Sequence, residues 1–208
     1  MKQIFKGQML TLNSIVNNIL SVYERADKSF KNDWYSEANM FASHLAVMYD
    51  IPITIVCGII AALSPIKTWE QNKLITETFL RTGKAKHVKL FQEKAEAIYA
   101  SDGDVTTIAE ILNGRKITAF FLNILTPNCS NAITIDRHAL SIILGYSVSD
   151  KQYRGITATQ YEFMVSAYHL AGKRAGISPI LMQSITWQQW RAERGIIENI
   201  LTGDEVPF

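Results

Sequence analysis

Apolar residues recur at the spacing of an α-helix along nearly the whole chain. The segment LTLNSIVNNILSVYERA places them three and four residues apart, and DWYSEANMFASHLAVMY, WEQNKLITETFL and VKLFQEKAEAIYA repeat the pattern. This spacing gives one apolar face per helix. No strand ladder and no hairpin turn stands out, and the only extended segment that we expect is the short AITI. The sequence therefore predicts an all-α domain of about ten helices.

Helix-start signals divide this pattern. Residues 51–63, IPITIVCGIIAAL, are apolar all round and predict a buried central helix that ends at Ser-Pro. The next helix can begin at Ser64-Pro65 or at the capping box TWEQ, residues 68–71. The other predicted starts are Asp104, Asp136, the capping box TATQ (residues 157–160) and Ser178-Pro179, and we expect Gly172 or Gly176 to end the helix that TATQ begins.

Composition excludes several classes of protein. The 208 residues, 48% of them hydrophobic, suffice for one large domain or for one domain of two lobes. Two cysteines cannot form a four-cysteine zinc or iron–sulfur site, and the four histidines lack metal-ligand spacing, so no metal is expected. The chain shows neither a signal peptide nor an apolar run long enough to span a bilayer. We therefore expect a cytoplasmic protein without a membrane partner.

Charge is nearly balanced overall but uneven locally. The net charge of +2 says little about partners. The run RTGKAKHVK, residues 81–89, contains four basic residues and no acid. Such a run suits phosphate contact, although composition alone favours a solvated loop and helix start.

Residues 113–145, NGRKITAFFLNILTPNCSNAITIDRHALSIILG, resemble the centre of the helix-hairpin-helix DNA glycosylase superfamily, of the endonuclease III type. In that family a glycine-containing hairpin ends in G-x-K-T-A and opens a helix. An extended piece then leads to V-D-T-H, which opens the next helix, and leucine-glycine follows. The corresponding residues here are Gly114, Arg115, Lys116, Thr118 and Ala119, then Ile135, Asp136, Arg137 and His138, then Leu144 and Gly145. Upstream, IVCGIIAALSPIKTWEQNKLITETFL resembles the family's early helix pair with its DNA-probing loop, so the likeness spans residues 52–145.

The resemblance implies a fold and a reaction. It implies one two-lobed helical domain over residues 1–208, in which 52–145 form the core and 1–51 with 146–208 complete the second lobe. DNA would be the partner, and a flipped nucleotide would enter a cleft between the lobes. Asp136 would stabilise the cationic sugar or activate the nucleophile, and Lys116 would form a Schiff base in a lyase branch. The implied function is base excision by an N-glycosylase.

The resemblance also suggests binding residues. A looser pattern shared with uncharacterised phage and bacterial proteins, AALSPIKTWEQN, DRH and LMQSITWQQWR, places further polar and aromatic residues at one cleft. The expected DNA- or substrate-binding residues are Asn113, Gly114, Arg115, Arg137, His138, Ser64, Lys67, Trp69, Asn72, Gln183, Trp187 and Arg191. No iron–sulfur cluster is expected, and the one cofactor that the family leaves open is a monovalent cation at the hairpin.

The chain departs from the family pattern in ways that keep alternatives open. The hairpin has Gly114 alone where the family has L-P-G-V-G, and Arg137 replaces the threonine of D-T-H. Asp136 can be a helix cap alone, Lys116 a solvated charge, His138 a structural histidine and Trp187 a core residue. Two other functions therefore stay open: a non-catalytic DNA-binding module, and an enzyme for another nucleobase or nucleotide. The sequence leaves the oligomeric state open.

Overall fold

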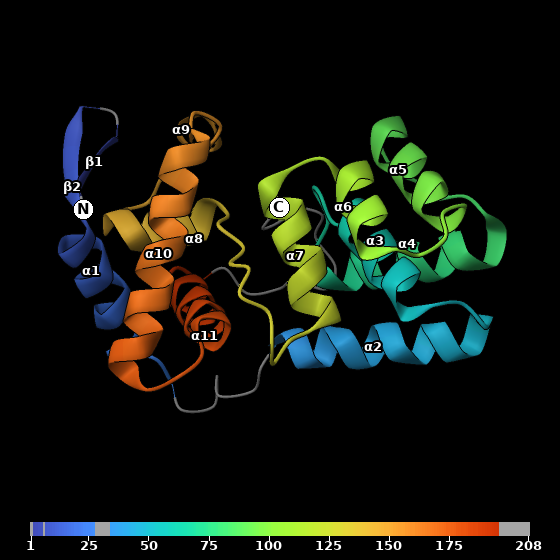
Figure 1. Ribbon diagram of the computed structural model, residues 1–208, viewed down its shortest axis with the longest axis horizontal. Coiled ribbons are helices and arrows are strands. Elements are labelled where there is room, and N and C mark those ends of the chain that lie inside the picture. The colour runs from blue at the N-terminus through green and yellow to red at the C-terminus, as the bar shows by residue number, and fades with distance from the viewer. Residues whose placement is uncertain (1, 6, 28–33, 196–208) are drawn as a thin grey trace. The chain divides into compact units, whose positions relative to one another are not determined.

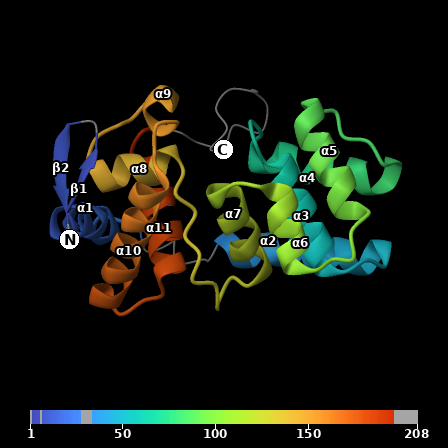
Figure 2. The ribbon, with the colours of Figure 1, turned by 45° about the horizontal axis from the view of Figure 1, so that its top comes forward.

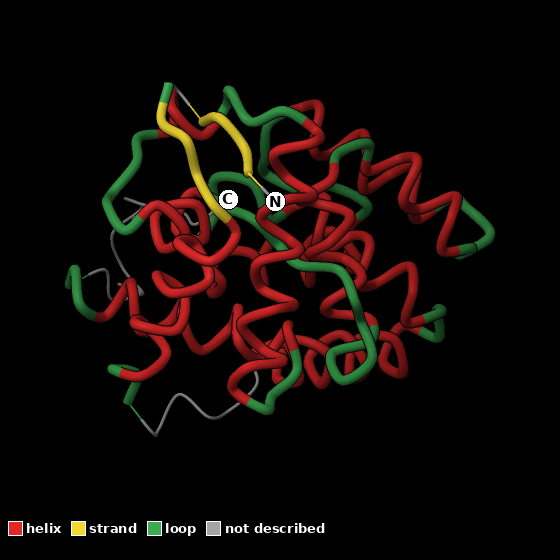
Figure 3. Tube along the Cα trace, turned by 60° about the vertical axis from the view of Figure 1, so that its left-hand side comes forward, coloured by secondary structure: helices red, strands yellow, loops and turns green. Residues whose placement is uncertain are grey.

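The computed structural model describes residues 2–5, 7–27 and 34–195, which form eleven helices and one two-stranded hairpin (Figure 1). The predicted all-α class is confirmed, since helices make up most of the described chain (Figure 3). The elements are β1 (Lys2–Phe5), β2 (Gln8–Thr11), α1 (Leu12–Glu24), α2 (Trp34–Tyr49), α3 (Ile53–Leu63), α4 (Trp69–Thr82), α5 (Lys89–Tyr99), α6 (Val105–Leu112), α7 (Arg115–Leu125), α8 (Arg137–Leu144), α9 (Asp150–Tyr153), α10 (Ala158–Ala175) and α11 (Pro179–Ala192).

The chain divides into two compact units. Unit 1 takes both ends of the described chain, within residues 1–34 and 128–197, and unit 2 is the continuous segment Tyr35–Pro127. These boundaries differ from the predicted ones, because α2 from Tyr35 onward belongs to unit 2 and α8 belongs to unit 1. Residues 196–208 of the predicted second lobe lie outside the described residues.

Unit 2 is built around α3, as the all-round apolar sequence predicts. Its residues from Ile55 to Leu63 are all buried, and α3 packs against α4, α5, α6 and α7 (Figure 2). Gly58 permits this close packing: a Cβ atom there would lie 2.8 Å from Ile108 Cγ2 and 3.0 Å from Ile98 Cγ2. A central helix with neighbours on every side needs this small residue, because cores have no spare volume.

Unit 1 packs α1, α8, α10 and α11 around one apolar core. The strands β1 and β2 pair antiparallel, and the hairpin contacts α1 and α10 (Figure 3). The sequence prediction missed this hairpin. Each strand has only four residues, and Gly7, at φ 82°, replaces the usual Asn-Gly or Asp-Gly turn signal.

Most predicted helix starts are confirmed. Asp104, Asp136 and Ser178 cap α6, α8 and α11, and the Thr68 and Thr157 capping boxes begin α4 and α10. Gly176, in the left-handed region, ends α10.

The start predicted at Ser64-Pro65 is wrong. Ser64 instead ends α3, with its hydroxyl donating to Ala61 O at 2.8 Å. Ile66 has φ 56°, which a right-handed helix cannot contain, and the Lys67 amide closes the turn onto Ser64 O.

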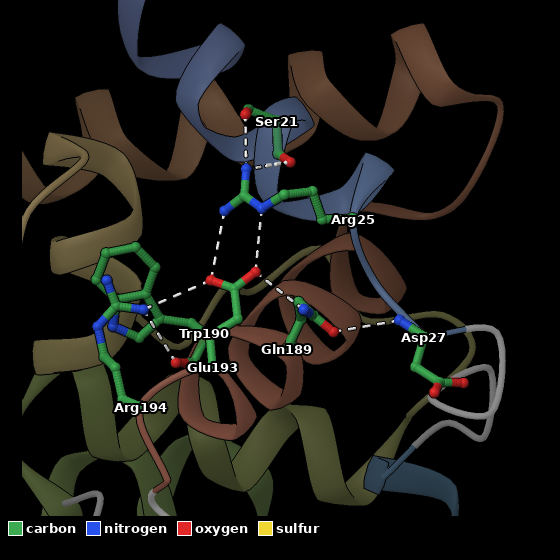
Figure 4. Close-up of polar contacts among 7 residues, drawn as sticks. All are labelled: Ser21, Arg25, Asp27, Gln189, Trp190, Glu193 and Arg194. Atoms are coloured by element: carbon green, nitrogen blue, oxygen red, sulfur yellow. Dashed lines mark hydrogen bonds and ion pairs between the residues drawn. The ribbon is translucent and has the colours of Figure 1, made fainter.

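A polar network fixes the ends of α1 and α11 in unit 1 (Figure 4). Arg25, which follows α1, donates to Glu193 at 3.0 Å and to the carbonyl of Ser21 at 2.7 Å. Gln189 accepts from the Asp27 amide at 3.2 Å and donates to Glu193 at 2.9 Å. These contacts hold the chain leaving α1 against the last turn of α11.

We expect Gly172→Ala to lower the free energy of unfolding by about 1–2 kcal/mol, since overpacking outweighs the better helix propensity of alanine. A Cβ atom at Gly172 would lie 2.9 Å from Ile177 O and 3.1 Å from the Cα and N atoms of Pro179, all of them backbone atoms. Urea denaturation measures the change. Gly155→Ala is the control, because its Cβ would meet only Gln152 O at 3.8 Å. Equal stability of the two variants would contradict the prediction.

Glu193 predicts a pH dependence. The hydrogen bond from Arg25 lowers the pKa of Glu193 below its ordinary 4.5, against the opposing effect of burial. A carboxyl group with a lowered pKa in the folded state stabilises the protein above its unfolded pKa, and loses this effect as the pH falls through the folded value. The side chains of Arg25 and Glu193 are 50% and 27% exposed, so Glu193→Gln should cost about 0.2–1 kcal/mol at pH 7. The free energies of unfolding of the variant and the wild type should converge as the pH falls through the lowered pKa that Glu193 has in the folded protein. A difference that stays constant with pH would exclude the carboxylate as its origin.

Candidate functional site

Asp136 is the first residue of the candidate site and is 1% exposed. Its Oδ1 accepts from the Ala139 amide at 2.7 Å, which caps α8. Its Oδ2 accepts from the indole Nε1 of Trp187, on α11, at 2.8 Å. The predicted cap is therefore present, and the same carboxylate also ties α8 to α11. Both oxygens receive N–H donors, as a buried charge requires.

The extended segment before Asp136 is held by two tyrosines. Tyr161 donates its hydroxyl proton to Ile133 O at 2.8 Å, and its oxygen accepts from the Ile135 amide at 3.2 Å. Tyr153 donates to Ile135 O at 2.6 Å. Burial raises the pKa of Tyr153, and the nearby charge of Asp136 raises it further, so this hydroxyl stays a donor. The tyrosines supply the partners that a neighbouring strand would otherwise provide, and thereby fix where Asp136 lies.

Trp187 lies between a carboxylate and a guanidinium. Its ring edge donates to Asp136, while the guanidinium carbon of Arg191 lies 4.3 Å from its ring centroid. The rings of Trp34 and His138 lie at centroid distances of 6.5 Å and 6.4 Å from it. A cation over an indole face is attracted by the ring quadrupole. The arrangement therefore places opposite charges on the edge and the face of one indole.

Two other predicted residues of unit 1 are close in sequence to Asp136 and Trp187. Arg137 forms an ion pair with Asp150 at 3.5 Å. Gln183 is buried on α11. Of the predicted residues, Asp136, His138, Trp187 and Arg191 thus form one continuous set of contacts, which we call the Asp136 cluster.

Unit 2 contains the predicted hairpin, formed by α6, Asn113-Gly114 and α7. Asn113 has φ 47° and ψ 58°, so it is the left-handed residue of the turn, whereas Gly114 is extended at φ 179°. A Cβ atom at Gly114 would meet only Ile117 Cγ2, at 3.4 Å. The hairpin therefore needs no second glycine, because asparagine tolerates the left-handed conformation.

The N-terminus of α7 faces outward without a side-chain cap. No hydrogen bond from the Gly114 position caps it, and its first turn contains no acid. Asn113, Gly114 and Arg115 are exposed, and Lys116 is half-buried. Lys94 of α5 donates its ammonium proton to Leu112 O, the last carbonyl of α6. The arrangement places the first-turn backbone of α7 and two cations at one helix start.

The remaining predicted residues of unit 2 have structural contacts. Asn72 donates to Ile60 O at 3.1 Å and accepts from Thr76 at 3.3 Å, which ties α4 to α3. Trp69 packs its ring edge against Phe41 at a centroid distance of 5.7 Å. Lys67 is half-buried in the turn that follows Ser64. Both the nitrogen and the oxygen of the Asn72 side-chain amide therefore have hydrogen-bond partners.

The structure divides the predicted catalytic pair, since Asp136 belongs to unit 1 and Lys116 to unit 2. It also identifies residues that the sequence prediction missed, namely Trp34, Tyr153 and Tyr161. Tyr161 immediately follows the predicted capping box at 157–160, so its helix was expected, but its partners lie 26 and 28 residues away. Helical periodicity contains no signal for such a contact.

Within the described residues, no group of three His, Cys, Asp or Glu side chains could hold a metal ion. Cys57 is a free thiol whose burial in α3 raises its pKa to about 12. No single described helix is long and apolar enough to cross a membrane. Helices α2 and α3 reach the necessary length and apolar composition only when they are taken together, and the chain bends by 120° between them.

We expect Trp187→Phe to lower the free energy of unfolding by about 1.5–3 kcal/mol, because it removes the indole donor from a buried carboxylate. Asp136→Asn and the double variant complete a double-mutant cycle, measured by urea denaturation. The double variant should be more stable than the sum of the single losses predicts, since both changes break the same bond. Additivity within about 0.5 kcal/mol would show that the bond contributes no coupling.

Of three comparisons with known proteins, one gives a match. Neither the curated proteins nor the solved structures contain a match. A family model matches residues 1–194, and so covers both the Asp136 cluster and the hairpin. The chain therefore belongs to the family of unknown function DUF7178.

Proposed function

We propose that this protein binds DNA through the α6–α7 hairpin and excises a base as an N-glycosylase. The observation that carries the proposal is the hairpin, which presents the uncapped start of α7 beside Arg115 and Lys116. A helix N-terminus carries partial positive charge and N–H donors, which suit a phosphate group. The missing side chain of Gly114 leaves the backbone accessible to such a group.

The order of the two units along the chain supports the same proposal. Unit 2 is a continuous helical segment that contains the hairpin and Lys116, and unit 1 is formed from both sides of it and contains Asp136. The resemblance to the glycosylase superfamily likewise implies one continuous lobe and one lobe formed from both of its flanks, but it assigns Asp136 together with Lys116 to the continuous lobe. This support concerns only the order of the units along the chain. The proposed reaction depends on Asp136.

The proposed reaction breaks the glycosidic bond between the sugar C1′ atom and the base nitrogen. The bonding electrons leave with the base, and a cationic sugar forms. Asp136, fixed by two N–H donors, supplies a preorganised negative charge for this cation. Water then adds at C1′ and releases a proton. In the lyase form the neutral amine of Lys116 adds at C1′ instead of water and loses a proton. The C1′–O4′ bond of the sugar ring then breaks, O4′ takes up a proton, and the Schiff base forms.

A second candidate is a non-catalytic DNA-binding module. It is favoured by the burial of Asp136 and by the use of both its oxygens, because a helix cap and an inter-helix bond account for this residue without catalysis. In this case the hairpin binds DNA and the Asp136 cluster only stabilises unit 1.

The two candidates differ in base release. We expect the wild type to release a base from at least one duplex in a panel that carries uracil, oxidised, alkylated and phage-modified bases. Asp136→Asn should slow this release by about 100-fold or more, whereas Trp187→Phe, which keeps the carboxylate, should slow it less. Comparison at a temperature where both variants are folded separates catalysis from stability.

Borohydride trapping tests the lyase form. A covalent adduct that forms with the wild type and disappears with Lys116→Ala would identify the amine. DNA binding without base release across the panel would exclude the glycosylase and leave the binding module. Absence of both binding and release would exclude both candidates.

A further inference from the structure

We propose that residues 81–89, from the last turn of α4 to the first residue of α5, are a second phosphate-binding surface for duplex DNA. We call this segment the basic turn. The inference rests on the proposed DNA binding and extends it from the hairpin to another part of unit 2. The partner is the sugar-phosphate backbone, so the surface would contribute affinity without base preference.

The backbone of the basic turn is held in place by its own side chains. Gly83 leaves α4 in the left-handed region at φ 72°, and its amide donates to Phe79 O at 2.7 Å. The Thr82 hydroxyl accepts from the Lys84 amide at 3.3 Å. Ala85 is buried between two exposed lysines, Lys84 and Lys86. The inward side chain fixes the turn, and the lysines on either side face outward.

His87 fastens the other end of the basic turn. Its Nδ1 accepts from the Val88 amide at 2.8 Å, and its ring lies 4.9 Å from that of Phe91 on α5. Both ends of the turn are therefore anchored. A phosphate would therefore meet cations on a backbone that is already fixed, and less backbone entropy would be lost on binding.

Three of the four cations of the basic turn lack acidic partners among the described residues. Arg81, Lys84 and Lys86 are exposed, and within the described ranges none of them forms an ion pair. Lys89 pairs with Glu93 at 3.6 Å, but these side chains are 89% and 54% exposed, so the pair is weak. Three positive charges are thus left to attract an anion.

The start of α5 adds to this attraction. No side chain caps it, and its first turn contains no acid. The start of α7 at the hairpin has the same two properties together with neighbouring cations. Lys94 of α5 donates to Leu112 O, so the helix that begins at the basic turn also contacts the end of α6 where the hairpin begins. Two similar phosphate-binding starts therefore belong to one packed unit.

The salt dependence of binding tests the inference. Fluorescence anisotropy with a labelled duplex of about 25 base pairs gives Kd at several salt concentrations, and the slope of log Kd against log salt counts phosphate contacts at about 0.9 each. We expect the triple variant Arg81→Gln/Lys84→Gln/Lys86→Gln to reduce this slope by about 2–3 and to weaken binding at least about tenfold at low salt.

The matched control removes three exposed positive charges from unit 1, as Lys151→Gln/Arg154→Gln/Lys173→Gln. It should change the slope by less than about 0.5, because these residues lie outside the proposed surface. Circular dichroism checks that both triple variants fold, which exposed positions allow. If the two variants reduce the slope equally, the basic turn is not a specific surface and the inference is overturned. Failure of the wild type to bind DNA would instead overturn the proposed function.

Discussion

Unit 1 depends on one buried charge, the carboxylate of Asp136. A carboxylate without hydrogen bonds would be too costly inside a protein, so its two oxygens determine what surrounds it. One oxygen accepts from the α8 backbone and the other from the indole of Trp187 on α11. This arrangement fixes α8 against α11 and places Arg191 over the indole face. The most polar group of the core is therefore also the residue that orders its neighbours.

Unit 2 depends on close packing instead of a buried charge. Its central helix α3 is apolar on all sides, and Gly58 brings it close to Ile98 and Ile108. The polar groups of this unit lie at its helix ends, where α5 and α7 begin without side-chain caps or acidic residues. The two units thus offer different chemistry: a fixed negative charge in one, and two helix starts with neighbouring cations in the other.

Helix existence was predictable because it depends on local spacing and on caps that lie within three residues. Thr68, Asp104, Asp136 and Thr157 all cap where the sequence places them. The prediction failed at Ser64-Pro65, where the two residues have the right types but Ile66 turns the chain out of helical geometry. It also missed the N-terminal hairpin, whose strands are too short to show a period of two residues. Local rules are reliable only when no competing turn is nearby.

The sequence by itself determined the helical class, the central position of α3 and the role of Asp136 as a helix cap, because short-range spacing and hydrogen bonding decide these features. Only the tertiary structure decided which groups meet Asp136. The indole of Trp187 lies 51 residues away in sequence, and no periodicity connects the two. The structure likewise decided that Asn113, and not Gly114, takes the left-handed position of the hairpin. Such choices depend on packing between distant segments, which a single sequence does not display.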